Sequence, residues 1–176
     1  MPLSPVADWS NFYVIVGSAA GGLTGLTFVV IVLSAGVNRV NATGVHAYLT
    51  PTIVHFGTVL AMAAYLSVPR QTAISLCIGF AAAGAAGLLY CAVVARRFRR
   101  FSTQYVPANE DWLWNVIVPA VVYGTLLAMA GISWHRLDRG LYGVGAASVA
   151  LLFIGIRNSW DVAVWNSVKK RSDADG

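Results

Sequence analysis

The chain has 176 residues, of which 57% are apolar and only 11% charged, and its formal net charge is +5. Soluble domains typically carry about 25% charged residues, because a surface that faces water has to be covered. The composition therefore excludes a soluble globular domain, and the length leaves no room for an appended soluble catalytic module. We expect an all-α polytopic membrane helix bundle in which residues 1–176 form a single transmembrane domain.

Five apolar runs are each long enough to cross a bilayer, since about 20 helical residues span a hydrocarbon core of about 30 Å. None of the runs alternates in the way of a membrane β-barrel strand. The breaks between them carry Gly, Asn, Pro and charge, which are typical of helix ends and interfacial loops. The expected spans are 12–35, 45–68, 72–95, 112–134 and 141–168.

The distribution of Lys and Arg predicts the orientation of the chain. With five spans, three of these residues fall on the side of the amino terminus and eight on the side of the carboxyl terminus. The basic excess marks the cytoplasmic side, so we expect the amino terminus outside and the carboxyl terminus in the cytoplasm. Anionic lipid headgroups then account for the net charge, and we expect no nucleic-acid partner.

The first run carries a regular face of small residues, because Gly17, Gly21 and Gly25 are spaced by four. Membrane helices associate by close backbone approach across such residues. One interpretation is tight packing within a subunit. The other is that this helix lines a subunit contact or a narrow pore.

The last run contains charged and polar residues in its cytoplasmic half, where they are costly to place in a membrane. Arg157 and Asp161 are four apart, which puts them on one helix face where they can pair, and Asn158 lies beside them. A charge near the bilayer centre costs at least about 2.5–3.5 kcal/mol, so it is normally paired and faces inward. The pair either fixes helix packing as an internal salt bridge or lines an aqueous cavity, an ion path or a partner site.

Three other spans place polar groups at a comparable depth, and together with the last span they define an intramembrane polar layer. The second span contributes His55, the first Thr24 and the fourth Tyr123. Such a histidine is either a hydrogen-bonded structural residue or a proton relay or gating residue. Haem ligation is not expected, because His46 and His55 are nine apart and lie on opposite helix faces. We expect no metal site and no cofactor.

Two prolines, Pro51 and Pro119, fall inside the second and fourth spans. Each removes a backbone hydrogen bond, so each predicts a kink or a hinge.

The segments FYVIVGSAAGGLTGLTFVV, residues 12–30, and IRNSWD, residues 156–161, resemble a family of small bacterial inner-membrane proteins with five helices. Some of these carry a transferred label as modulators of a membrane-bound AAA protease. The resemblance implies a multi-pass protein of the bacterial cytoplasmic membrane. It implies no catalytic residues.

These features together predict a homo-oligomer that acts as an ion channel or a channel-like protein, with the polar layer at its permeation or gating region. A ring of such subunits could enclose a path for a small ion, whereas a single subunit offers little room for one. The alternative is a non-conducting accessory or regulatory subunit that binds a larger membrane complex or protease. We expect no enzyme, because the sequence shows no nucleophile–base pair and no metal-ligand spacing.

Overall fold

A computed structural model describes residues 4–35, 42–101 and 109–172, and within them the side chains of residues 6–32, 50–99, 110 and 112–161. The described residues are almost entirely helical and contain no strand, which confirms the all-α prediction. The elements are α1 (Ser4–Asp8), α2 (Ser10–Ala35), α3 (Ala42–Leu66), α4 (Ala73–Phe101), α5 (Asn109–Trp112), the π-helix η1 (Leu113–Ile117), α6 (Val118–His135) and α7 (Leu137–Ser172).

Four described segments are long and apolar enough to cross a membrane. They are Ser10–Val32, Ala73–Arg99, Leu113–His135 and Leu137–Asp161. The second expected span corresponds to α3, in which the shorter segment Thr50–Leu66 is apolar. The chain is therefore a multi-pass helical membrane protein with four long apolar helices and one shorter one.

Helices extend into two of the expected loops. The break expected at residues 135–140 is reduced to Arg136, because α6 ends at His135 and α7 begins at Leu137. Likewise α4 continues to Phe101, beyond the expected span limit at residue 95. Arg, Leu and Phe are good or tolerated helix residues, so charge ends the apolar run at these places without ending the helix.

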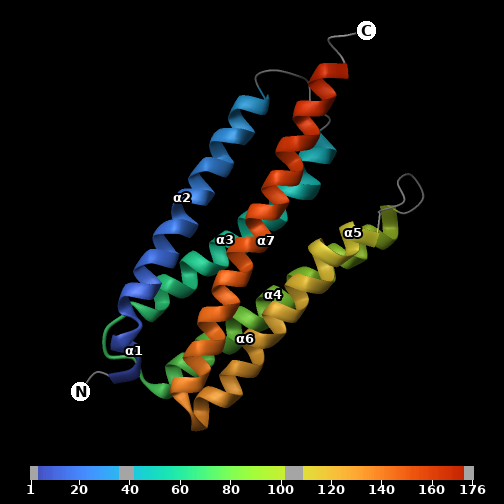
Figure 1. Cartoon of the computed structure of the whole chain (residues 1–176). Coiled ribbons are helices and arrows are strands. Elements are labelled where there is room, and N and C mark those ends of the chain that lie inside the picture. The colour runs from blue at the N-terminus through green and yellow to red at the C-terminus, as the bar shows by residue number, and fades with distance from the viewer. Residues whose placement is uncertain (1–3, 36–41, 102–108, 173–176) are drawn as a thin grey trace.

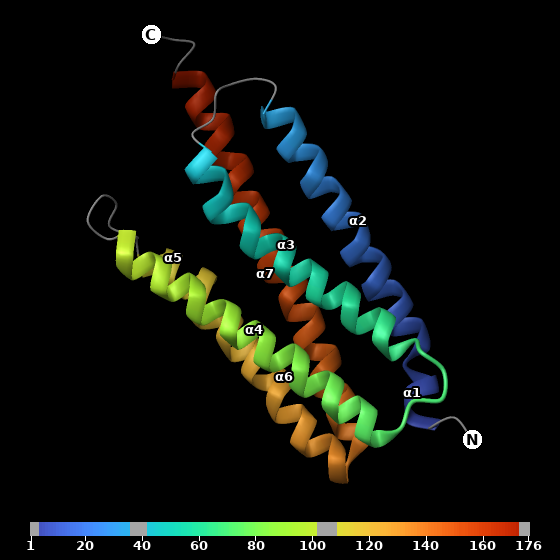
Figure 2. The same ribbon diagram turned by 180° about the vertical axis from the view of Figure 1, so that it is seen from behind.

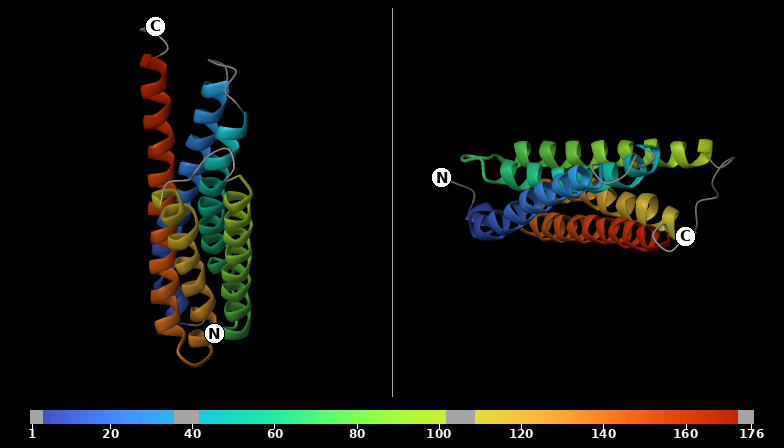
Figure 3. Two further views of the ribbon diagram at one scale, coloured as in Figure 1. Left: turned by 90° about the vertical axis from the view of Figure 1, so that its right-hand side faces the viewer. Right: turned by 90° about the horizontal axis from the view of Figure 1, so that it is seen from above.

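The long helices form an elongated bundle, in which α7 runs along one face between α2 and α6 (Figure 1, Figure 3). One side of α7 packs on α3 and another on α6, while α2 packs on α3 and α4 packs on α6. We call the end with α1, the 67–72 segment and Arg136 the corner end, and the end where α7 finishes the tail end. The amino-terminal helix and the last turns of α7 lie at these opposite ends (Figure 1).

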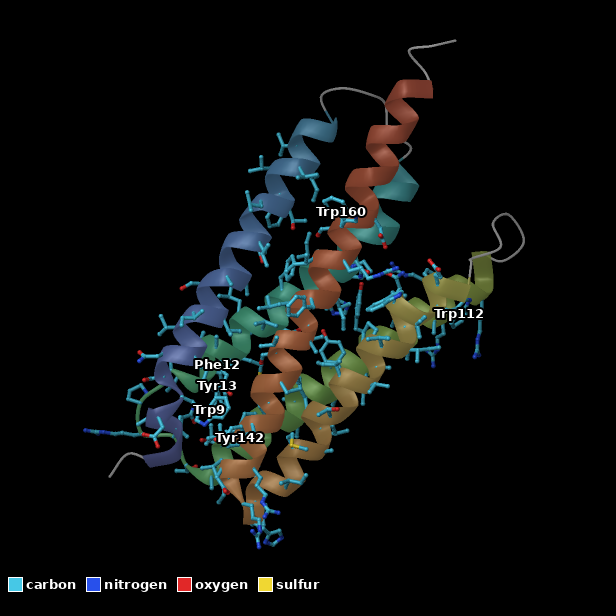
Figure 4. The ribbon with its side chains drawn as sticks, viewed as in Figure 1. Trp9, Phe12, Tyr13, Trp112, Tyr142 and Trp160 are labelled. Carbon is cyan, nitrogen blue, oxygen red and sulfur yellow. The ribbon has the colours of Figure 1, made fainter. Side chains whose placement is uncertain are left out.

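Aromatic side chains gather at the corner end. Trp9 lies edge-on to Tyr142, with ring centroids 4.9 Å apart, and edge-on to Phe12 at 5.2 Å. Phe12 and Tyr13 meet in the same way. Figure 4 shows this cluster near the start of α2 and α7, with Trp112 and Trp160 farther toward the tail end. Trp and Tyr favour the membrane–water interface, so the two groups suit the two surfaces of a bilayer.

The link between α3 and α4 holds these two helices together at the corner end. Tyr65 Oη donates to the Ser75 carbonyl at 2.6 Å, and Gln71 Nε2 donates to the Tyr65 carbonyl at 2.7 Å. Thr72 and Ser75 cap the start of α4 reciprocally through their hydroxyls and backbone N–H groups. Beyond this link α3 and α4 run side by side with their ribbons apart (Figure 2), and each packs mainly on other helices.

The two prolines expected as hinges lie in different settings, Pro51 inside an α-helix and Pro119 just after a π-helix. Pro51 is buried within α3. Pro119 follows the π-helix, where the Val118 N–H bonds the Leu113 carbonyl five residues back. A wider π turn before a proline leaves more room for the proline ring, which in an α-helix clashes with the carbonyl four residues earlier.

Candidate functional site

The centre of the bundle holds a hydrogen-bonded pair from two helices. His55, near the middle of α3, and Tyr123 of α6 are both 0% exposed, and His55 Nδ1 lies 2.9 Å from Tyr123 Oη. Their rings are 5.7 Å apart between centroids. The two residues are expected in the polar layer on different spans, and the structure brings them into direct contact.

Thr58 extends this pair. Its Oγ1 lies 3.3 Å from Tyr123 Oη and donates to the Val54 carbonyl at 2.8 Å. Thr58 is not one of the residues that the sequence singles out. Its position three residues after His55 puts it on the same face of α3, so helical spacing is the signal that could have found it.

A third helix, α4, also contributes to this group. Tyr90 of α4 meets the His55 ring edge-on, with centroids 6.5 Å apart. Gly87, one turn earlier, faces the Tyr123 ring so closely that a Cβ there would overlap it. We name His55, Thr58, Tyr90 and Tyr123 the histidine cluster. Tyr90 could not be found from the sequence, because no local pattern places α4 beside the second span.

One imidazole nitrogen of the histidine cluster has no partner. His55 Nε2 is buried and makes no hydrogen bond within the described part of the chain. Buried polar atoms are nearly always paired, so this nitrogen makes His55 a candidate functional residue.

Arg157 and Asp161 pair with each other as the sequence predicts, but not inside the bundle. Arg157 Nη1 donates to Asp161 Oδ2 at 2.9 Å, and the two side chains are 32% and 53% exposed. Arg157 Cζ also lies 4.2 Å from the centre of the Trp114 ring, which ties α7 to η1 by a cation–π contact. The pair therefore lies on the bundle surface toward the tail end of its span, apart from the buried histidine cluster.

Asn158 and Thr24 have separate environments. Asn158 is buried, 4% exposed, and its Nδ2 makes no hydrogen bond within the described residues. Thr24 Oγ1 donates to the Ala20 carbonyl of its own helix at 2.8 Å, so its hydroxyl is satisfied locally. The structure thus splits the expected layer into the histidine cluster, the Arg157–Asp161 pair, Asn158 and a self-bonded Thr24.

The three glycines of α2 differ in their surroundings. A Cβ on Gly17 would lie 2.8 Å from Ala63 Cβ of α3, so this glycine allows close packing within the subunit. A Cβ on Gly21 would lie 4.0 Å from Leu60 Cδ1, and Gly25 has nothing within 4 Å. Only the first of the three therefore faces a close neighbour among the described residues.

No group of three or more His, Cys, Asp or Glu among the residues that the structure describes could hold a metal ion. Comparison of the chain with models of protein families, with curated proteins and with solved structures gives no match.

Proposed function

We propose that the chain forms a homo-oligomer that acts as a channel or channel-like protein for protons or another small ion in the bacterial cytoplasmic membrane. The observation that carries this proposal is the histidine cluster in the middle of the apolar helices. An ionisable side chain inside a membrane span is costly and is by default a functional-site candidate. Here it is held by a tyrosine and keeps one nitrogen unpaired among the described residues.

The Arg157–Asp161 pair supports the same proposal. Both side chains are partly exposed on the surface of α7, within a span that is mainly apolar. Charged groups avoid lipid chains, so this face favours a neighbouring subunit or water beside it. In a ring of subunits the pair would lie at the mouth of the path, where its charges would select among ions.

The flux of ions through purified protein in liposomes tests this function. We expect conductance that changes on Asp161→Asn and on Arg157→Gln, because each leaves the other charge uncompensated. Asp138→Asn is the matched control and should leave the conductance unchanged, because Asp138 is an exposed carboxylate at the corner end of the same helix. A well-folded oligomer that conducts no ion would overturn the proposal.

An accessory subunit is the second candidate, and the outer face of α2 favours it. Ser18, Gly22 and Gly25 are exposed there, and a Cβ added to either glycine would have no described atom within 4 Å. Small residues in a membrane helix admit a close partner helix, from a second copy or from another membrane protein. Purification in mild detergent distinguishes the two candidate functions, because an accessory subunit should co-purify with a different protein in fixed stoichiometry.

A further inference from the structure

The hydrogen bonds of the histidine cluster determine where the proton of His55 lies. The Thr58 hydroxyl already donates its only proton to the Val54 carbonyl. Its oxygen can therefore only accept from Tyr123 Oη, 3.3 Å away. If Tyr123 donates to Thr58, then Tyr123 Oη is free to accept from His55 Nδ1 at 2.9 Å.

This direction uses every donor of the hydrogen-bonded chain. It runs from the Nδ1–H of His55 to Tyr123, from Tyr123 to Thr58 and from Thr58 to the backbone, and it leaves only the Nε2 lone pair unused. In the opposite direction Tyr123 donates to His55, and the proton moves to Nε2, where it has no acceptor among the described residues. Orphaned buried donors are rarer than under-satisfied acceptors. The cluster thus favours the Nδ1–H tautomer with a bare Nε2.

The chain of hydrogen bonds is also a dead end for a proton. It finishes on the Val54 carbonyl, and a backbone carbonyl does not pass a proton onward. A proton that reaches His55 therefore binds at Nε2 and leaves from Nε2. The imidazole is then a proton-binding site and not a link in a proton wire.

The described groups that face His55 offer no negative charge to an imidazolium. Tyr123 faces it from α6 and Tyr90 from α4. On α7, Arg157 and Asp161 are paired with each other, and Tyr13 is the only titratable side chain described on α2. A buried charge without a partner is strongly unfavourable. The closed arrangement seen here is therefore the arrangement of the neutral imidazole.

Binding of a proton at Nε2 requires the helices around it to move, since His55 is 0% exposed. The separation of α3 and α4 provides a direction for this movement. The two helices are tied by Tyr65 and Gln71 at the corner end. Elsewhere α3 packs mainly on α2 and α7, whereas α4 packs mainly on α6, and the ribbons of α3 and α4 stay apart (Figure 2). Water that enters from the tail end would reach the face of His55 on which Tyr90 lies.

We infer that Nε2 of His55 is a proton-binding site whose occupation opens the bundle between α3 and α4, so that acid activates conduction. The gating consequence rests on the function proposed above, whereas the proton site itself does not. The linkage has a definite sign. An open, hydrated conformer binds the proton better than the closed one, so lowering the pH shifts the population toward the open conformer. One linked proton per subunit changes that equilibrium by at most about tenfold per pH unit.

Nitrogen-15 NMR of histidine-labelled protein in lipid bilayers tests the proton site. His55→Asn assigns the signals, because the chain has three histidines. We expect Nδ1 protonated and Nε2 bare at neutral pH, and both protonated in acid. Tyr123→Phe removes the acceptor of the Nδ1 proton, so its spectrum should lose the preference for the Nδ1–H tautomer. An Nε2–H tautomer in the unmodified protein would overturn the assignment.

Conductance of the same liposomes, measured against pH, tests the gating. We expect acid activation that is lost in His55→Asn, which cannot bind a proton, and kept in His135→Asn, which alters an exposed histidine at the end of α6. Conductance that does not depend on pH would overturn the gating and leave the channel standing. If no ion is conducted at any pH, both the gating and the proposed function fall, and the NMR result decides the proton site by itself.

Discussion

At the scale of single residues, Tyr123 does the most to organise the bundle centre. Its hydroxyl lies between His55 and Thr58, and its ring packs against Gly87 of α4. One side chain of α6 thus determines how α3 and α4 meet it. A buried polar group satisfied in this way specifies one arrangement of helices, because sliding any of them breaks the hydrogen bonds.

Tyr123→Phe should destabilise the protein by about 1–3 kcal/mol, the cost of leaving a buried hydrogen-bonding group unpaired. Unfolding by denaturant in detergent micelles measures this loss. Thr125→Val is the control on the same helix, since the Thr125 hydroxyl donates to the Val121 carbonyl of its own helix. Equal losses in the two variants would show that the contact with His55 contributes nothing.

The sequence predicts some residues of the site and not others, for physical reasons. Arg157 and Asp161 pair as predicted, because four-residue spacing on a helix is a local property. Spacing along a helix does not, however, predict which neighbour each helix face packs against. His55 and Thr24 fall at similar depth, yet His55 is buried against α6 whereas Thr24 bonds its own backbone.

At the scale of elements, α4 and α6 form the closest helix pair. A Cβ on Gly84 would lie 2.6 Å from the backbone nitrogen of Leu127, so the two backbones approach closely at this point. Hydropathy predicts that both segments are helices. The expected spans, 72–95 and 112–134, agree within a few residues with the apolar segments Ala73–Arg99 and Leu113–His135. It does not predict that they are partners, because lipid-facing and helix-facing sides are both apolar.

Gly84→Ala should therefore separate α4 from α6 and cost about 1–3 kcal/mol, as overpacking does. The neighbour is backbone and not the end of a flexible side chain, so it has little freedom to move away. Gly124→Ala, on α6 with nothing within 4 Å of its Cβ position, is the matched control. It should leave stability unchanged or raise it by up to about 1 kcal/mol, because Ala favours a helix over Gly. Thermal unfolding in detergent compares them, and equal melting temperatures would contradict the close approach.

At the scale of the whole molecule, α1 and the last turns of α7 lie at opposite ends of the bundle, which agrees with an odd number of crossings (Figure 1). Whether α3 crosses the membrane decides that number. Four crossings would put these two segments on one side of the membrane, and five put them on opposite sides.

Single cysteines placed at the two ends of the bundle test the orientation, after Cys77 and Cys91 have been replaced by serine or alanine. In intact cells an impermeant thiol reagent should label Asp8→Cys, at the end of α1, and should not label Arg99→Cys near the end of α4. Both sites are exposed. Permeabilised cells provide the control, in which both should react. Labelling of Arg99→Cys in intact cells would reverse the proposed orientation.

The single-residue corner at Arg136 has a consequence for how the protein is made. Residues 113–161 form two apolar helices joined by one non-helical residue, and the corner carries Arg136, Asp138 and Arg139. So short a link leaves no loop between the two helices. We therefore expect them to enter the membrane as one helical hairpin with the charged corner at its tip.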